Sequence, residues 1–183
     1  MTSQAYSVLT AIGTDRIGIV EDIADQVARR GGNIAESRMA VLGGEFAAIL
    51  LVAMAEPELA GLEAALAGLE RDLALHLELK RTSRPLPRPA EGRPYRLETV
   101  SLDTPGIVQA ITSLLKRHRI NIEELETATV PAPWTGAPMF RMHATLILDG
   151  TVQLARLKAE LAALEGEKDW DIRLRPAFAA QVD

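Results

Sequence analysis

Two short groups of residues that could bind a ligand recur along this chain at one displacement. Asp15-Arg16-Ile17-Gly18-Ile19-Val20 returns 88 positions later as Asp103-Thr104-Pro105-Gly106-Ile107-Val108, and Asn33-Ile34 returns at the same displacement as Asn121-Ile122. A carboxylate can face an ammonium group, and a helix that begins near a glycine offers its first backbone N–H groups to an anion. A carboxamide can donate to a carboxylate and accept from an ammonium. The groups together predict a receptor for a zwitterion.

The candidate ligand-binding residues are equivalent in the two copies. They are Asp15, Gly18, Ile19 and Asn33 in the first copy, and Asp103, Gly106, Ile107 and Asn121 in the second. Each type also has a purely structural interpretation. Asp15 can cap its helix, and Thr104 with Pro105 can form an ordinary N-cap and first-turn pair. The glycines can allow close packing of helix on sheet, and the asparagines can close a helix end.

The duplication extends through the second half of each copy and reveals an insertion. Leucines recur at a displacement of 95, as Leu59, Leu62, Leu66, Leu69 and Leu154, Leu157, Leu161, Leu164. This displacement exceeds 88 by seven, which predicts a seven-residue insertion in the second copy. We place it near 131–138, a proline-rich segment that stands where the first copy turns at Gly43-Gly44. Trp134 in this segment is expected to pack in an interface rather than over a ligand.

Hydrophobic periodicity predicts the same order of elements in each copy. In the first copy we expect strands at 6–12, 34–42, 46–54 and 75–79 and helices at 15–30 and 57–73. In the second we expect strands at 95–102, 121–130, 139–148 and 170–174 and helices at 105–118 and 152–164. The order βαββαβ is that of a ferredoxin-like fold. We therefore predict an α+β protein with two ferredoxin-like domains in tandem, each a four-stranded antiparallel sheet with two helices on one face. The other face is left without helices, so a further contact must account for it.

The domains are predicted at 1–81 and 95–183, with a linker rich in proline and arginine at 82–94. The four prolines of the linker favour an extended, semi-rigid spacer that sets the geometry of the two copies. The same composition also suits a proline-rich ligand for a partner domain. We prefer the spacer.

Composition excludes several classes of protein. Apolar residues make up 48% of the 183 residues and aromatic residues 4%, which predicts two small aliphatic cores. There is no cysteine, so disulfides and thiolate metal sites are excluded. A formal charge of −5 disfavours direct binding of nucleic acid. No apolar run approaches the roughly 20 residues that cross a bilayer, and the N-terminus lacks a secretory signal. We expect a cytoplasmic protein without membrane attachment.

Patterns of catalysis and of metal binding are not found. His76, His118 and His143 have no helical i, i+4 partner, so we predict no metal site and no other cofactor, and an enzyme is the least favoured class. The βαββαβ order also serves RNA-binding modules, which stack bases on aromatic side chains in a basic central strand. The segment 45–52 has one aromatic residue and no positive charge, so RNA binding is not supported.

The combination of repeat, fold and motif resembles the ACT domain family of amino-acid-responsive regulatory modules. The resemblance rests on Asp-x-x-Gly-Ile-Val at the first strand–helix junction and Asn-Ile after that helix, and it spans about 6–174. The second copy fits the family's Asp-x-Pro-Gly pattern, whereas the first has Ile17 in place of the proline. The resemblance implies binding of amino acids at interfaces between domains, in oligomers, without catalysis.

We therefore expect a non-catalytic regulatory protein that binds a small amino acid such as glycine. If it acts on transcription, its acidic surface favours contact with another regulatory protein, such as a transcription factor, over contact with DNA. A homo-oligomer is expected. The alternative is an assembly module without a ligand, which only joins subunits.

Overall fold

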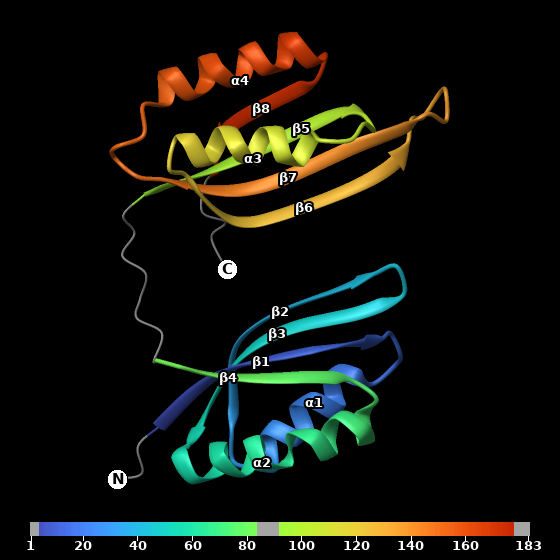
Figure 1. Cartoon of the computed structure of the whole chain (residues 1–183), viewed down its shortest axis with the longest axis vertical. Coiled ribbons are helices and arrows are strands. Elements are labelled where there is room, and N and C mark those ends of the chain that lie inside the picture. The colour runs from blue at the N-terminus through green and yellow to red at the C-terminus, as the bar shows by residue number, and fades with distance from the viewer. Residues whose placement is uncertain (1–3, 84–91, 178–183) are drawn as a thin grey trace. The chain divides into compact units, whose positions relative to one another are not determined.

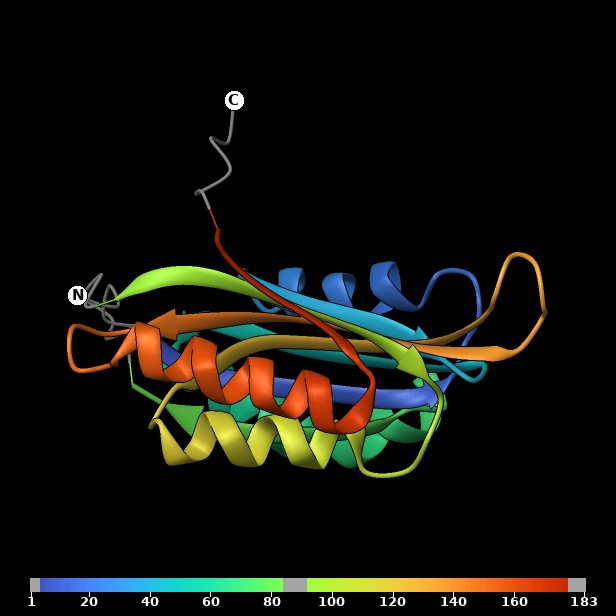
Figure 2. The same cartoon turned by 90° about the horizontal axis from the view of Figure 1, so that it is seen from above.

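The computed structural model describes residues 4–83 and 92–177, which form two compact units (Figure 1). Within these ranges, each unit is a four-stranded antiparallel sheet with two helices on one face. In Figure 2 the helices α3 (Ile107–Arg117) and α4 (Leu154–Lys168) of the second unit lie side by side along their sheet. The predicted α+β class and the ferredoxin-like arrangement are confirmed in both copies.

The elements of the first unit follow the predicted order. They are β1 (Gln4–Thr14), α1 (Ile19–Ala28), β2 (Asn33–Leu42), β3 (Glu45–Ala55), α2 (Glu56–Leu73) and β4 (His76–Thr82). The strand order is β2-β3-β1-β4, so β2 and β4 are the edges of the sheet. The predicted turn at Gly43-Gly44 joins β2 to β3, where Leu42 pairs with Glu45.

The second unit repeats this topology. Its strands are β5 (Arg93–Leu102), β6 (Asn121–Pro131), β7 (Pro138–Leu148) and β8 (Asp171–Pro176), and α3 and α4 complete it. The strand order β6-β7-β5-β8 matches that of the first sheet, strand for strand. Each unit also has a register shift near the start of its edge strand, between Ile34 and Glu36 and between Ile122 and Glu124. The duplication therefore extends to the irregularities of the sheet.

The predicted helix ends differ from the observed ones in several places, of which three are informative. α1 begins at Ile19 rather than at Asp15, and α3 begins at Ile107 rather than at Pro105. In both cases the preceding residues form a turn that ends in a glycine with positive φ. α4 runs on to Lys168, past the predicted end at 164, because polar residues continue the helix without adding an apolar position to mark it.

The strands β4 and β5 extend into the two ends of the predicted linker. β4 includes Thr82, and β5 begins at Arg93, so Pro94 lies in a strand and pairs with Ile147. A proline near the beginning of a strand is compatible with a sheet. Residues 84–91 lie outside the described residues, and the role of this segment as a spacer stays a prediction.

The predicted seven-residue insertion is divided between two places. Gly13 pairs with Phe46, and its equivalent Ser101 pairs with Phe140, which gives a displacement of 94 at this point. Six extra residues therefore lie in the β6–β7 loop, and the seventh lies between β7 and α4. The loop projects past the end of the sheet (Figure 1, Figure 2), and Trp134 within it is 97% exposed. Its role in an interface stays a prediction.

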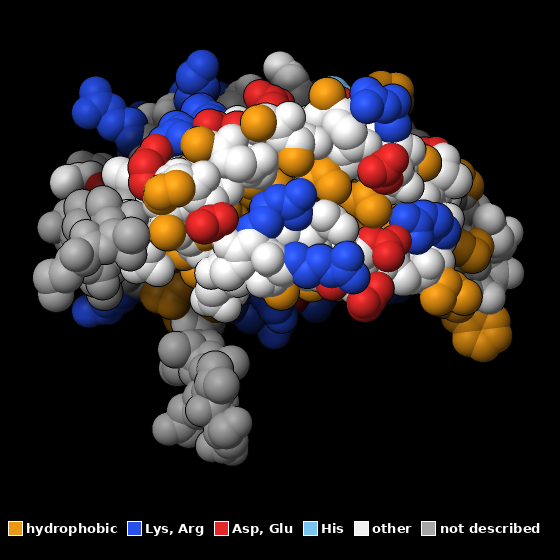
Figure 3. Space-filling view, turned by 90° about the horizontal axis from the view of Figure 1, so that it is seen from below, with side chains coloured by type: hydrophobic (Ala, Val, Ile, Leu, Met, Phe, Trp, Pro, Cys, Tyr) orange, Lys and Arg blue, Asp and Glu red, His pale blue; other side chains and the backbone are white. Residues whose placement is uncertain are grey.

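A core composed mainly of aliphatic side chains fills the space between each sheet and its helices. α1 contributes Ile19, Ile23 and Val27, which are buried because their spacing of four places them on one face of the helix. Full burial of such a side chain stabilises the fold by about 1.5–3 kcal/mol. Apolar side chains of α1 and α2 line a narrow seam between the helices, and Figure 3 shows apolar side chains at the surface of this face among charged ones.

The two sheets differ on the faces that carry no helices. In the first sheet the central strands β1 and β3 bring apolar side chains together on that face, namely Val8, Ile12, Ile49 and Leu51, and the edge strands place Glu36, Arg38, Glu78 and Lys80 beside them. In the second sheet the register brings charged and histidine side chains together there, namely Arg96, Glu98, Arg141, His143, Arg173 and Arg175. The apolar centre of the first face favours contact with another surface, whereas the charged centre of the second favours water.

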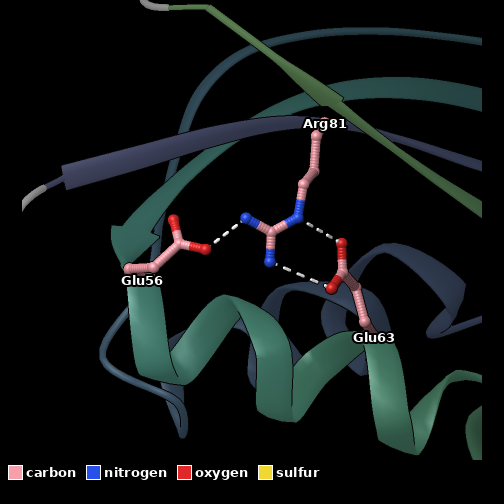
Figure 4. A network of polar contacts seen from close by, with 3 residues as sticks. All are labelled: Glu56, Glu63 and Arg81. Carbon is pink, nitrogen blue, oxygen red and sulfur yellow. Dashed lines mark hydrogen bonds and ion pairs between the residues drawn. The ribbon is translucent and has the colours of Figure 1, made fainter.

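Arg81 on β4 connects the edge of the first sheet to α2 (Figure 4). Its Nε and Nη2 donate to the two carboxylate oxygens of Glu63 at 2.8 and 3.0 Å, and its Nη1 donates to Glu56. The hydrogen bonds from Arg81 lower the pKa of Glu63, and those to Glu63 and Glu56 raise the pKa of Arg81. All three side chains are partly exposed, so water screens the network and its contribution to stability is modest.

Replacing Arg81 with glutamine should lower the melting temperature of the first unit at neutral pH, and the difference should shrink in acid. The folded state lowers the pKa of Glu63, so the contact stabilises the fold above the unfolded-state pKa and is lost as the pH falls through the folded-state pKa. Calorimetry from neutral pH down to about pH 3 measures this difference. Lys80→Gln is the matched control, because Lys80 faces the other side of the same strand. An equal loss in both variants would contradict the assignment.

Candidate functional site

Each candidate site lies where the first strand of a unit turns into its first helix. We call the turn 15–18 with the start of α1 the first junction, and the turn 103–106 with the start of α3 the second junction. The backbone N–H of Asp15 donates to Gly44 O at 2.9 Å, and that of Asp103 donates to Pro138 O at 3.0 Å. Each junction is thereby fixed to the strand hairpin beside it, through one hydrogen bond at equivalent positions.

The glycine of each junction is required by the backbone. Gly18 has φ 92° and Gly106 has φ 96°, a conformation that residues with a side chain rarely adopt. A Cβ on Gly18 would meet nothing nearer than Arg16 Nη1 at 4.0 Å, and one on Gly106 would meet nothing within 4 Å. Close packing of helix on sheet therefore does not explain these glycines. The space beside both of them is open.

The starts of α1 and α3 have no side-chain cap. Gly18 O accepts the N–H of Asp22 and Gly106 O accepts the N–H of Ala110, both at 2.9 Å, which are the first hydrogen bonds of the two helices. Within the described residues no side chain caps either helix start, so the alternative interpretation of Asp15 as a helix cap is wrong. The first N–H groups of a helix and the positive end of its dipole together favour an anion.

A groove opens beside the first junction, between the start of α1 and the second half of β2. Its volume is about 690 Å³, and Asp15, Gly18 and Ile19 are among its lining residues. The opposite wall is apolar and comes from Met39 and Val41 of β2. The structure thus brings three of the four predicted residues of the first copy to one groove.

Arg16, another residue of this rim, is held away from the groove's apolar wall. Its Nη2 lies 2.7 Å from an Asp22 carboxylate oxygen and donates to Leu73 O at 3.3 Å. Leu73 ends α2, so the contact joins the first junction to the second helix of the unit. Asp15 and Glu21, the other charged residues that line the groove, are both exposed.

The two asparagines lie at the opposite ends of their sheets from the junctions. Asn33 pairs with Ala53, seven residues along β3 from Phe46, which lines the groove. At about 3.3 Å per residue this is roughly 23 Å. Asn121 pairs with Ile147 while Asp103 bonds Pro138, so the second unit repeats the separation. Within one unit, the predicted receptor of aspartate, glycine and asparagine is therefore not assembled.

The second junction has the same backbone but a different side-chain environment. Thr129 Oγ1 donates to Asp103 Oδ2 at 3.0 Å. The equivalent of Thr129 in the first copy is Val41, which has no hydroxyl, so Asp15 lacks this hydrogen bond. Asp103 is therefore bonded to the edge strand β6, whereas Asp15 makes no equivalent bond to β2.

Sequence reasoning missed the groove residues of β2, although the alternation Met39-Ala40-Val41 indicated which residues share a face.

The histidines pair with carboxylates rather than with one another. The distances to the nearest carboxylate oxygen are 2.9 Å for His76 and Glu70, 3.2 Å for His118 and Glu160, and 3.9 Å for His143 and Glu98. Among residues 4–83 and 92–177, no group of three or more acidic or histidine side chains is placed to hold a metal ion. No helix in the described part of the chain is long and apolar enough to span a bilayer.

Comparison with known proteins agrees with this architecture. The ACT domain model matches residues 5–80. Over 164 residues the chain is 32% identical to the glycine cleavage system transcriptional repressor of Escherichia coli strain K12, covering 90% of this chain and 86% of that protein. The protein of the same name from Shigella flexneri is equally similar.

Solved structures resemble the chain over nearly its whole length. An unknown protein from Galdieria sulphuraria is 32% identical with a TM-score of 0.77, covering 96% of this chain and 100% of the other. A candidate glycine cleavage system transcriptional repressor is 24% identical with a TM-score of 0.70, which supports the fold. The chain therefore belongs to the ACT domain family, and its near full-length relatives in that family include glycine cleavage system transcriptional repressors.

Replacing Gly18 with alanine should lower the free energy of unfolding of the first unit by about 1–2 kcal/mol, because a Cβ is strained at positive φ. Gly106→Ala should do the same in the second unit. Gly61→Ala is the matched control, since Gly61 lies inside α2 and its Cβ would meet nothing. That change should instead stabilise the unit by about 0.5–1 kcal/mol. Urea unfolding followed by circular dichroism measures each value, and a neutral Gly18→Ala would contradict the assigned backbone role.

Proposed function

We propose that this protein is a non-catalytic regulator that binds an amino acid at its glycine-bearing junctions and acts through contact with another protein. The observation that carries the proposal is the uncapped helix start at each junction, built twice with φ 92° and 96° at the glycine. Membership in the ACT domain family supports it, and so does the name of the Escherichia coli relative, a transcriptional repressor of the glycine cleavage system.

The proposed ligand is bound through its main-chain groups. Its carboxylate faces the first N–H groups of α1 or α3, where the helix dipole favours negative charge. Its ammonium faces the carboxylate of Asp15 or Asp103. Ile19 and Ile107 are buried and hold the start of each helix on the core, so that these groups keep their positions. Glycine and other small amino acids all carry this pair of charges, and no catalytic group is needed to recognise them.

Asn33 takes part in this proposal as a residue of a second copy. β2 is an edge strand that begins at Asn33 and ends at Leu42, beside the first junction. If two β2 strands pair antiparallel about a two-fold axis, the beginning of each lies beside the end of the other. Asn33 of one copy then reaches the junction of its partner. The proposed homo-oligomer thus completes a site that a single unit leaves open, and Asn121 on β6 is placed in the same way.

A regulatory output follows if the ligand prefers one arrangement of the copies over another, because only a differential affinity can shift an equilibrium. A ligand held by two copies satisfies this condition. The net charge of −5 favours a protein partner, such as a transcription factor, over nucleic acid.

An amino acid should raise the melting temperature of the purified protein. At about 100 times the dissociation constant, the added stability is about 2.7 kcal/mol. Asn33→Ala should weaken binding by about 1–3 kcal/mol through a lost hydrogen bond, as measured by calorimetric titration. Thr82→Ala, on the other edge strand, is the control and should bind as the wild type does. If no common amino acid shifts the melting temperature at millimolar concentration, the chain is an assembly module instead.

Mixing two defective variants should restore binding if each site is shared by two copies. Asp15→Asn and Asn33→Ala, each in an Asn121→Ala background, should bind weakly alone. In a refolded equal mixture, half of the dimers are mixed, and each mixed dimer has one site with both native residues. About one first-junction site in four is therefore intact. Titration of the mixture against each variant alone measures the recovery. A mixture no better than its components would show that the site does not span two copies.

A further inference from the structure

The groove of the first junction has more apolar surface than recognition of a ligand's main chain requires. Val20 is 45% exposed, Met39 50% and Val41 52%, and all three line the groove. Phe46 also lines it and is buried. Ile17, beside the groove on the turn, is fully exposed. Apolar side chains held in water around one groove are unfavourable, and contact with an apolar group relieves that exposure.

Three of the equivalent positions of the second junction are polar, whereas Val108 and Phe140 keep the residue types of Val20 and Phe46. Thr112, Thr127 and Thr129 stand where the first copy has Ala24, Met39 and Val41. The Thr129 hydroxyl bonds Asp103, and the Thr112 hydroxyl donates to Val108 O at 2.8 Å. The backbone of the two junctions is the same, so they differ in the side chains that would face a ligand's side chain.

We propose that the first junction takes an amino acid with an apolar side chain, of the size of valine, leucine, isoleucine or methionine, and that the second junction does not share this preference. The inference rests on the proposed function, because it assigns a ligand class to one of the two sites proposed there. With the ligand's charged groups at the start of α1 and at Asp15, its side chain faces the wall formed by Met39 and Val41.

Glycine has no side chain, so it would leave that wall in water and gain nothing from it. A polar side chain would lose hydration there without gaining a partner, since Met39 and Val41 offer no hydrogen-bonding side chain. The charged residues that line the groove besides Asp15 are Arg16, which is already bonded to Asp22 and to Leu73 O, and Glu21, which lies on α1 and not on the wall formed by β2. An apolar side chain is the one class that gains from every wall residue on β2.

Calorimetric titration of the full chain with leucine, isoleucine, methionine, glycine and serine tests the preference. Leucine or isoleucine should bind at least about 10-fold tighter than glycine. The double variant Met39→Thr, Val41→Thr copies the residues of the second junction into the first. It should lose at least about 10-fold in leucine affinity while its affinity for glycine stays unchanged. Both residues are half exposed, so the fold should tolerate the change.

Ile49→Thr is the matched control, because Ile49 is also 50% exposed but faces the other side of the same sheet. An equal loss of leucine affinity in this variant would overturn the proposal. Tighter binding of glycine or serine than of leucine by the wild type would also overturn it, yet would leave the proposed function standing. Binding of no amino acid would overturn both. If the double variant only dissociates oligomers and leaves leucine affinity unchanged, a second protein copy occupies the groove, and the proposal is wrong.

Discussion

The positive φ of Gly18 and Gly106 is the constraint on which both junctions depend. It turns the chain sharply after the first strand, so that the helix starts without a side-chain cap. The bond from Asp15 N–H to Gly44 O, and its equivalent from Asp103 to Pro138, hold the turn against the neighbouring hairpin. The first N–H groups of each helix therefore follow a glycine with open space beside it, and a buried isoleucine holds the helix start on the core. A ligand that uses these groups needs no rearrangement of the backbone.

Duplication has preserved the backbone of this protein more closely than its surfaces. The two units share strand order and register shifts. They also share a hydrogen bond from the start of the last strand to a glutamate of the preceding helix: Glu70 accepts the N–H of Leu77 at 2.8 Å, and Glu165 accepts that of Ile172 at 3.0 Å. Their exposed features diverge. On the helix-free faces the central strands are apolar in the first sheet and charged in the second, Met39 and Val41 of β2 are replaced by Thr127 and Thr129 of β6, and one hairpin carries a six-residue extension with Trp134. This divergence is the basis for the different ligand preferences proposed for the two junctions.

Much of this arrangement could be predicted from the sequence, because two displacements and the leucine spacing define the repeat and its helices. The helix starts could not, since Asp15-Arg16-Ile17 suits a first turn as well as a loop, and only the φ of Gly18 decides between them. The distance between Asn33 and the first junction was not foreseen, because Asn33 follows the helix closely in sequence. α1 carries the chain back along the sheet, about 15 Å for its ten residues, before β2 begins. The side-chain partner of Asp103 depends on register across two strands, which no local pattern contains.

If an amino acid binds at the start of α1 and α3, the backbone N–H groups of both helix starts should respond to it. Titration of the ¹⁵N-labelled protein, followed by two-dimensional NMR, observes the backbone N–H groups concerned. Saturable shifts are expected, centred on the amides of 18–21 and 106–109, with the same dissociation constant for neighbouring residues. Saturable shifts confined to another region, or none at millimolar amino acid, would contradict the proposed site.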